Sequence, residues 1–268
     1  MRKWLHIVLI LLPVLSCVGQ KDDPVGPGGT DPDTPGEGVD PAGEGKVFFR
    51  RSLVLDFTGT WCVNCPKMDA AIAETMEARP GRIVPVSVHC MMVDPMYVKP
   101  LSDDLVKRFG ISAYPSAVVD LDPESLITQS SPELLQSHID RLLATRETAA
   151  GIRMETTLDK GDLTVEAELK AVRDGDYTIV FLVLEDGIVA SQSGSTVDHV
   201  HNNVLRQWMD GETVALKEGE SMKRTWTCQV TEKQRLVVLA LLDGLVDNVT
   251  TCAVGGKADY QYEKESTQ

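Results

Sequence analysis

Apolar and polar positions follow two different patterns, which meet near residue 149. Before it, short apolar runs with β-branched residues alternate with stretches in which apolar residues recur at helical spacing. The runs predict buried strands and the stretches between them predict helices. The predicted strands are Ser52–Thr58, Arg82–His89 and Ser116–Leu121, and the predicted helices are Met68–Glu77, Ser102–Phe109 and Pro132–Thr145. Alternation of this kind is typical of an α/β layered fold.

After this point, single apolar residues alternate with polar ones, as from Leu163 to Leu169, and turn signals such as Asp174-Gly175 and Asp243-Gly244 separate the segments. Strands that follow one another without helices predict an antiparallel, immunoglobulin-like β-sandwich. The strand candidates are Tyr177–Leu184, Ser221–Val230, Arg235–Leu242 and Val246–Val254. We therefore expect an α/β domain at 47–148, an all-β sandwich domain at 149–258 and a tail at 259–268.

The first residues have the features of an export signal. Arg2 and Lys3 precede an apolar run that is too short to span a bilayer but suits a signal peptide at 1–16. Val14-Leu15-Ser16-Cys17 resembles a bacterial lipoprotein box, in which Cys17 becomes lipidated and anchors the chain to a membrane. The alternative is an ordinary signal peptide that contains a cysteine.

Residues 17–46 are expected to form the lipid anchor and a flexible tether. The stretch is rich in Gly, Pro, Asp and Glu, and it contains too few large apolar side chains to repay the entropy cost of ordering. Within it, Gln20-Lys21-Asp22-Asp23 resembles a surface-export signal of Bacteroidetes lipoproteins. The alternative is a solvated charge cluster. We expect export to the outer membrane and display at the cell surface.

Composition and net charge indicate a globular protein and disfavour one class of partner. The 268-residue chain is 43% hydrophobic and 25% charged, which are globular values. Its formal net charge is -14, which disfavours a nucleic-acid partner because phosphate binding needs a basic face.

Trp61-Cys62-Val63-Asn64-Cys65 lies directly after a predicted strand and at the start of a predicted helix. Backbone N–H groups and the dipole at a helix N-terminus stabilise an anion, so we expect the pKa of the Cys62 thiol to be lowered. Two intervening residues let the second sulfur fold back within bonding distance. Cys65 can then attack a mixed disulfide formed by Cys62 and release the product.

Neighbouring residues support a redox site. Asp56 lies on an apolar strand, where burial would raise its pKa and make it a proton acceptor for Cys65. Pro115 is expected to follow a cis peptide bond, to face the cysteines and to keep metal from entering between the sulfurs. Trp61 would shield one side. Tyr114 and Ser116, which flank this proline, form the edge where an extended peptide is expected to dock.

The segment Leu53–Met68 resembles the active-site segment of thioredoxins, and Tyr114-Pro115 matches their cis-proline loop. This resemblance covers residues 47–146 and implies a thioredoxin-like fold for the α/β domain. It also implies exported protein or peptide thiols and disulfides as partners, without a bound cofactor. The chain departs from the thioredoxin pattern in having Val63-Asn64 between the cysteines and Pro66 after them. Because the intervening dipeptide tunes the redox potential, the direction of exchange stays open.

Other interpretations of the cysteines and histidines stay open as well. Cys62 and Cys65 can be an inert disulfide, or half of a zinc site completed by His89-Cys90, and Cys90 can be a buried thiol or a third redox cysteine. Cys228 and Cys252, on two predicted strands, can form a structural disulfide or be two small buried side chains. The spacing of His199 and His201 places both on one face of a strand, where structural hydrogen bonding is favoured over metal binding. We expect no metal.

Taken whole, the chain resembles the roughly 28-kilodalton outer-membrane-protein (Omp) family of Bacteroidetes lipoproteins, whose lipidation signal it shares at Cys17. The segments Leu184–Gly187 and His201–Arg206 also carry this resemblance. It implies an outer-membrane location and adhesion or receptor roles. Two functions follow as hypotheses: thiol–disulfide exchange on exported proteins, and a surface binding module that uses the same fold as a scaffold.

Overall fold

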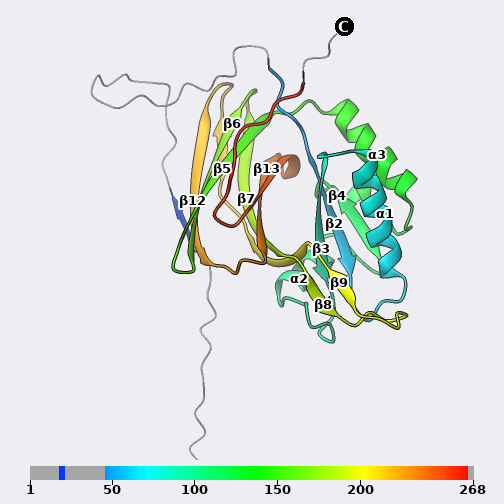
Figure 1. Ribbon diagram of the computed structural model, residues 1–268. Coiled ribbons are helices and arrows are strands. Elements are labelled where there is room, and N and C mark those ends of the chain that lie inside the picture. Colours follow the sequence, from blue (N-terminus) through cyan, green and yellow to red (C-terminus); the bar gives the residue numbers. More distant parts are fainter. Residues whose placement is uncertain (1–17, 22–45, 265–268) are drawn as a thin grey trace, which may run out of the picture.

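The computed structural model describes residues 18–21 and 46–264 (Figure 1). The predicted signal peptide, the predicted lipidation site at Cys17 and most of the predicted tether therefore lie outside the described residues. Residues 18–21 form strand β1 (Val18–Lys21), which pairs antiparallel with β12 (Ser221–Gln229).

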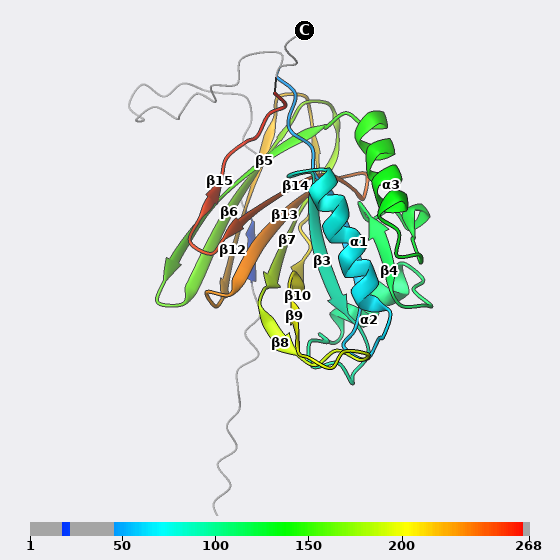
Figure 2. The same ribbon diagram turned by 45° about the vertical axis from the view of Figure 1, so that its right-hand side comes forward.

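The first part of the chain places two helices on one face of a small group of strands. Strand β2 runs parallel to β3 and antiparallel to β4. Helices α1 and α3 cover the face that Val54 shares with Ala117, whereas α2 packs against the opposite face (Figure 2). The elements are β2 (Ser52–Thr58), α1 (Cys65–Ala78), β3 (Ile83–His89), α2 (Leu101–Arg108), β4 (Ser116–Val119), the 3-10 turn η1 (Pro123–Ser125) and α3 (Pro132–Thr145).

The described residues of the second part contain no helix, as the alternating pattern predicts. A five-stranded sheet has the order β1-β12-β6-β5-β15, and β8 pairs with β9 in a short hairpin. The strands are β5 (Ala150–Asp159), β6 (Asp162–Ala171), β7 (Gly175–Glu185), β8 (Ile188–Ala190), β9 (His199–His201), β10 (Val204–Met209), β11 (Thr213–Leu216), β12, β13 (Gln234–Leu242), β14 (Leu245–Ala253) and β15 (Lys257–Ala258).

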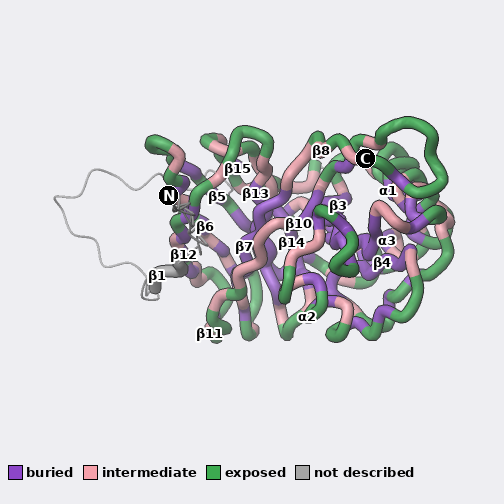
Figure 3. Tube along the Cα trace, turned by 90° about the horizontal axis from the view of Figure 1, so that it is seen from below, coloured by how far each residue is buried: buried purple, intermediate pink, exposed green. Residues whose placement is uncertain are grey.

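One large sheet joins both parts of the chain. Its order is β14-β13-β7-β10-β3-β2-β4, with β11 added beside β7. Strand β10 is the joint, because it pairs parallel with β3 at Val204 and Ser87 and antiparallel with β7 along its length. In Figure 3, buried residues run along β7 and β3, whereas most of β10 is of intermediate burial. The β8–β9 hairpin, which immediately precedes β10, is thereby brought against the end of β3.

The predicted fold class, a thioredoxin-like α/β domain followed by a separate immunoglobulin-like sandwich, is wrong. The described chain is mainly β-sheet, and its largest sheet contains strands from both predicted domains. The reason lies in β7 and β13, which are apolar on both faces. Alternate residues of β7, such as Leu182 and Val183, face two different hydrophobic cores. A strand that is covered on both faces lies at the centre of the fold, whereas a sandwich strand has one face in water. The predicted domain boundaries stay predictions.

A buried ion pair ties these elements together. The Arg50 guanidinium donates to the Asp120 carboxylate at 2.9 Å and to the carbonyl of Leu142 in α3 at 2.6 Å. Asp120 in turn accepts a hydrogen bond from the backbone N–H of Leu53 in β2, and its carbonyl accepts one from Val246 in β14. Because buried charges are costly unless they are paired and hydrogen-bonded, this network holds α3, β2 and β14 in a fixed relation.

Candidate functional site

The two cysteines of the motif form a disulfide between the end of β2 and the start of α1. Their Cα atoms are 5.4 Å apart, and the N–H of Cys65 donates to the carbonyl of Cys62 at 3.4 Å. Helix α1 begins at Cys65, so the positive end of its dipole lies at the turn that holds Cys62. The Lys67 ammonium donates to the side-chain oxygen of Asn64 and adds a positive charge to this turn. Cys62 is 6% exposed and Cys65 is 1% exposed.

Trp61 has a well-defined position beside the motif. Its indole N–H donates to the carbonyl of Cys90 at 2.9 Å, and its ring meets that of Tyr114 edge-on with centroids 5.1 Å apart. A Cβ atom on Gly59 would lie 2.4 Å from the indole nitrogen, so the close approach of Trp61 requires glycine there. The shielding of the disulfide by Trp61 stays a prediction.

The predicted cis peptide bond between Tyr114 and Pro115 is confirmed. The next residue, Ser116, opens β4 and is paired with Phe57 of β2. Its hydroxyl donates to the carbonyl of Ala113 at 2.8 Å, so this hydroxyl is used within its own loop. Peptide docking along Tyr114 and Ser116 stays a prediction.

Asp56 is buried, as predicted, and it faces α1 because it has the same parity on β2 as Val54. Burial raises its pKa well above the ordinary value, and the charge of Asp69 and a hydrogen bond with the Asp69 side chain raise it further. Among the described residues, no donor reaches either oxygen of an ionised Asp56. The hydrogen bond to Asp69 and the lack of any described donor for an ionised Asp56 are both explained when the two carboxyl groups share one proton. Two carboxylates hydrogen-bond only when one of them is protonated.

Asp69 connects the carboxylate pair to the disulfide. It lies four residues after Cys65 in α1, which places both side chains on the same face one helical turn apart. Asp56 is therefore accompanied by a second carboxyl group, and its role as a proton acceptor for Cys65 stays a prediction. The sequence analysis assigned only Asp56 to this role and missed Asp69, although the spacing from Cys65 within a predicted helix was a signal for it.

Three histidines lie near this carboxylate pair. His89 of β3 lies 3.0 Å from the Asp94 carboxylate, which also accepts the N–H of Thr60. The rings of His199 and His201, both from β9, are 4.7 Å apart, and that of His201 is 5.3 Å from His89. Burial, and then the neighbouring histidines, lower the pKa of His201 to about 4, so its ring is neutral at pH 7. Within the described chain, the predicted structural hydrogen bonding is absent at His201 Nε2, which is buried without a partner.

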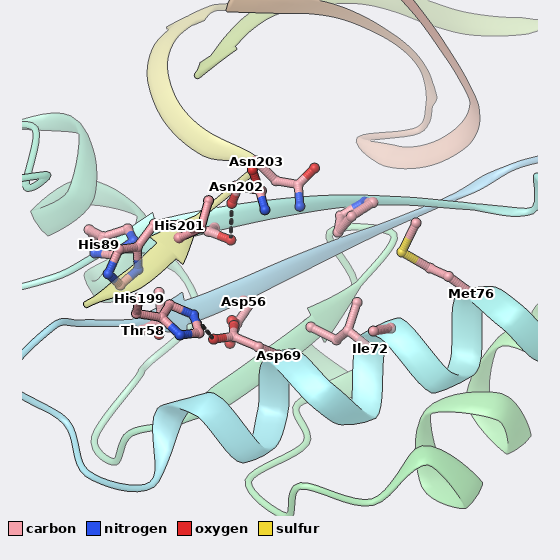
Figure 4. Close-up of a pocket in the computed structure, with 14 residues that line it drawn as sticks. Asp56, Thr58, Asp69, Ile72, Met76, His89, His199, His201, Asn202 and Asn203 are labelled. Atoms are coloured by element: carbon pink, nitrogen blue, oxygen red, sulfur yellow. Dashed lines mark hydrogen bonds and ion pairs between the residues drawn. The ribbon is translucent and has the colours of Figure 1, made fainter. Parts of the chain in front are cut away.

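These groups line one cavity of about 230 Å³ between α1, β3 and the β8–β9 hairpin (Figure 4). In the figure, Asp56 and Asp69 lie next to each other on the floor of the cavity and His199 lies against Asp69. His199 Nε2 is 3.8 Å from Asp69 Oδ2. The cavity exists because β3 residues Ser87 and His89 face the α1 side, while β10 touches β3 only at its first residue.

The loop between β8 and β9 also lies on the cysteine turn, which the sequence analysis did not foresee. The Gln192 amide donates to the carbonyl of Cys62 at 2.7 Å and to that of Gly59 at 3.2 Å. The N–H of Ser193 donates to the carbonyl of Thr60. Gly194 adopts φ +84°, and a Cβ atom there would lie 2.8 Å from Val63. The loop therefore covers the turn and is anchored to it.

The remaining cysteines are not part of this disulfide. Cys90 is a buried thiol whose Sγ donates to the carbonyl of Val88, and burial raises its pKa strongly. No three His, Cys, Asp or Glu side chains in the described parts of the chain are placed to hold a metal ion, so the zinc alternative gains no support.

Cys252 is a free thiol, so the candidate Cys228–Cys252 disulfide is not formed. Cys252 lies on β14 and Cys228 on β12, in two facing sheets.

The chain is similar to one protein family and to several solved structures. A family model described as Outer membrane protein Omp28 matches residues 102–258. HBP35 of Porphyromonas gingivalis matches with a TM-score of 0.67 and 14% identity, covering 78% of this chain and 76% of that one. Protein AGR_C_4864 from Agrobacterium tumefaciens matches with a TM-score of 0.53 and 14% identity, covering 79% and 97%. At these identities the similarity shows the fold alone.

No curated protein matches the chain. Within the part of the chain that the structure describes, no helix combines the length and the apolar character needed to cross a membrane.

Replacing Asp56 by asparagine tests the raised pKa. A raised folded-state pKa means that the contribution of Asp56 to stability is complete below its unfolded pKa of about 3.9 and is lost as the pH rises through the folded pKa. An asparagine side chain cannot ionise, so the variant has no such loss. We expect Asp56→Asn to increase the free energy of unfolding at about pH 8 by roughly 1–3 kcal/mol, and to give little increase near pH 4. Urea denaturation of the oxidised protein measures both values.

Asp104→Asn is the matched control, because Asp104 is exposed on α2. Asp104→Asn should show no pH-dependent increase in the free energy of unfolding. An Asp56→Asn variant that is equally or less stable than the parent at every pH would show that Asp56 is ionised without penalty.

Replacing Gln192 by alanine tests the anchoring of the loop. The change removes two hydrogen bonds, each worth about 1 kcal/mol, that hold the loop on Gly59 and Cys62. We expect dithiothreitol to reduce the Cys62–Cys65 disulfide of Gln192→Ala about fivefold faster or more. Ser191→Ala, at an exposed neighbouring position, is the control and should react at the parent rate. Equal rates in all three proteins would mean that the loop does not limit the access of dithiothreitol to the disulfide.

Proposed function

This chain belongs to the Omp28 outer membrane protein family, and we propose that it carries out thiol–disulfide exchange on exported proteins through Cys62 and Cys65. Its place is the outer membrane, as the family description states. Within the proposal, the chain is anchored there by lipid on Cys17 and acts at the cell surface. Its partners are thiols and disulfides of exported proteins or peptides, and it uses no bound cofactor.

The observation that carries this proposal is a cysteine pair at a helix start beside a buried carboxyl group. In the reduced protein, the positive end of the α1 dipole stabilises the Cys62 thiolate, and Lys67 adds a positive charge nearby. The raised pKa of Asp56 makes its carboxylate a stronger base than an ordinary one, which suits it to accept a proton. An inert structural disulfide has no use for a buried acid that, among the described residues, has only a second acid beside it.

The exchange proceeds in two balanced steps. The Cys62 thiolate attacks a disulfide of the partner, a bond forms between the two sulfurs, and the other partner sulfur leaves as a thiolate. Cys65 then gives its proton to the Asp56–Asp69 pair, and its sulfur attacks Cys62 Sγ. The mixed disulfide breaks, the Cys62–Cys65 disulfide forms and the second partner sulfur leaves. The partner gains two electrons and this chain loses two; a dithiol of another exported protein restores the reduced form by the reverse steps.

The geometry also limits which partners can react. Cys62 is 6% exposed and the Gln192 loop is hydrogen-bonded across its turn. A folded partner must displace this loop, whereas a thin extended segment along Tyr114 and Ser116 approaches from the β4 side. The proposal therefore favours extended or partly folded partner segments.

The covered cysteine turn also supports a second candidate function. A disulfide held under an anchored loop suits a surface binding or adhesion lipoprotein, in which the same disulfide fixes the shape of a binding surface. The two functions differ in whether Cys62 forms a bond to a partner, and the following experiment separates them.

Trapping of a mixed disulfide tests the proposed exchange. In Cys65→Ser the second step cannot occur, so we expect reduced Cys65→Ser to accumulate a covalent complex with a disulfide-bonded, unstructured peptide. Cys62→Ser should form none, because the attacking sulfur is gone. Cys90→Ser, with both motif cysteines intact, should turn the peptide over as the parent does. Mass spectrometry of the products under non-reducing conditions identifies the linked residues.

Failure of Cys65→Ser to form this complex, together with equal peptide reduction by the parent and Cys62→Ser, would contradict thiol–disulfide exchange. The disulfide would then be a structural part of a binding surface.

A further inference from the structure

Proton transfer at the buried site needs a route to water. Asp56 is 1% exposed, so a proton that it takes from Cys65 cannot pass directly to bulk solvent. Each exchange cycle nevertheless requires that proton to leave and another to return. Other groups in contact with Asp56 must therefore carry it.

Asp69 and His199 lie beside Asp56, and both are partly exposed to solvent. The Asp69 carboxyl group lies next to Asp56 (Figure 4), and its side chain is 37% exposed. His199 Nε2 lies 3.8 Å from Asp69 Oδ2, and the His199 side chain is 35% exposed. Exposure thus rises from the buried acid to its two neighbours. Figure 4 shows the three side chains following one another from β2, across α1, to the β8–β9 hairpin.

The cavity beside these groups is suited to water. It has a volume of about 230 Å³, which is ample for several waters at roughly 30 Å³ each. Among the described residues, His201 Nε2 and both Asp56 oxygens are buried in its lining without hydrogen-bond partners from a donor group, and such atoms are normally satisfied by ordered water. Hydrogen-bonded water also bridges gaps that are too long for direct proton transfer, such as that between His199 and Asp69.

The other titratable groups around the cavity are engaged or neutral, which leaves Asp69 and His199 available to carry a proton. On the β3 side, His89 is engaged with Asp94, whose carboxylate also binds Thr60. On β9, His201 stays neutral at pH 7 because burial and the adjacent histidines lower its pKa to about 4. On α1, Asp69 is the acid that lines the cavity, and on β9 His199 is the histidine that contacts it.

We propose that Asp69 and His199 form a proton path that connects Asp56 and Cys65 with solvent during disulfide exchange. An imidazole suits the outer position because it both accepts and donates a proton. In the second step of exchange, the proton leaves Cys65 for the carboxyl pair, passes to His199 and is given to water. The path runs in the opposite direction when the disulfide is reduced. This inference rests on the proposed exchange activity and assigns the β8–β9 hairpin a part in it.

The second chemical step, measured separately from the first, tests the path. The two steps are followed by stopped-flow mixing of reduced protein with a disulfide-bonded peptide, and the first step is isolated in Cys65→Ser. We expect Asp69→Asn to slow the second step about tenfold or more, and His199→Gln severalfold, with the first step unchanged. Added imidazole should restore much of the rate in His199→Gln. The pH dependence of the second step should shift in both variants.

Matched controls separate the path from general damage. His138→Gln changes a half-buried histidine on α3, and Asp104→Asn changes an exposed acid on α2; both should leave the two steps at the parent rates. Repeating the parent measurement with EDTA should also change nothing, because a loss of rate would show that the cavity acts through a bound cation.

An unchanged second step in Asp69→Asn and His199→Gln, or a lack of rescue by imidazole, would overturn the proton path while leaving thiol–disulfide exchange intact. If the exchange itself failed, the result would be different, because the parent would then reduce the peptide no faster than Cys62→Ser.

Discussion

The structure depends on the pairing of β10 with both β3 and β7. The backbone N–H of Ser87 in β3 donates to the carbonyl of Asn203 just before β10 begins, and this single junction joins two groups of strands into one sheet. Asn203 adopts φ 59°, and its N–H donates to the Asp186 carboxylate while Arg235 donates to its side chain. These contacts fix where the chain enters β10. The preceding hairpin is therefore placed against the end of β3.

That placement makes the site a composite of distant segments. The disulfide and the Asp56–Asp69 pair come from β2 and α1, whereas Gln192 and His199 come from the hairpin between β7 and β10. The hairpin covers the cysteine turn and supplies the polar side of the cavity. Both cysteines and Asp56 are buried, so in the proposed exchange partner access and proton transfer would depend on the hairpin.

The sequence predicted local elements well because their signals are local. Ser52–Thr58 and Pro132–Thr145 coincide with β2 and α3, since an apolar run and a helical period need no distant partner to be recognised. The disulfide, the cis bond before Pro115 and the burial of Asp56 also followed from the motif and its apolar strand. The sheet that both parts of the chain share could not be predicted, because the connecting role of β10 is seen only in its pairing with β3. For the same reason, no local pattern connected Gln192 with Cys62.

The acidity of Cys62 in the reduced protein tests the account most directly. Its rate of alkylation by iodoacetamide, followed on the Cys62 peptide by mass spectrometry across a range of pH, reports the fraction of thiolate. The account predicts that Cys62 in the folded, reduced chain reacts with an apparent pKa clearly below the value of about 8.5 for a free thiol. An apparent pKa at or above that value, or a Cys62 that reacts only after denaturation, would contradict it.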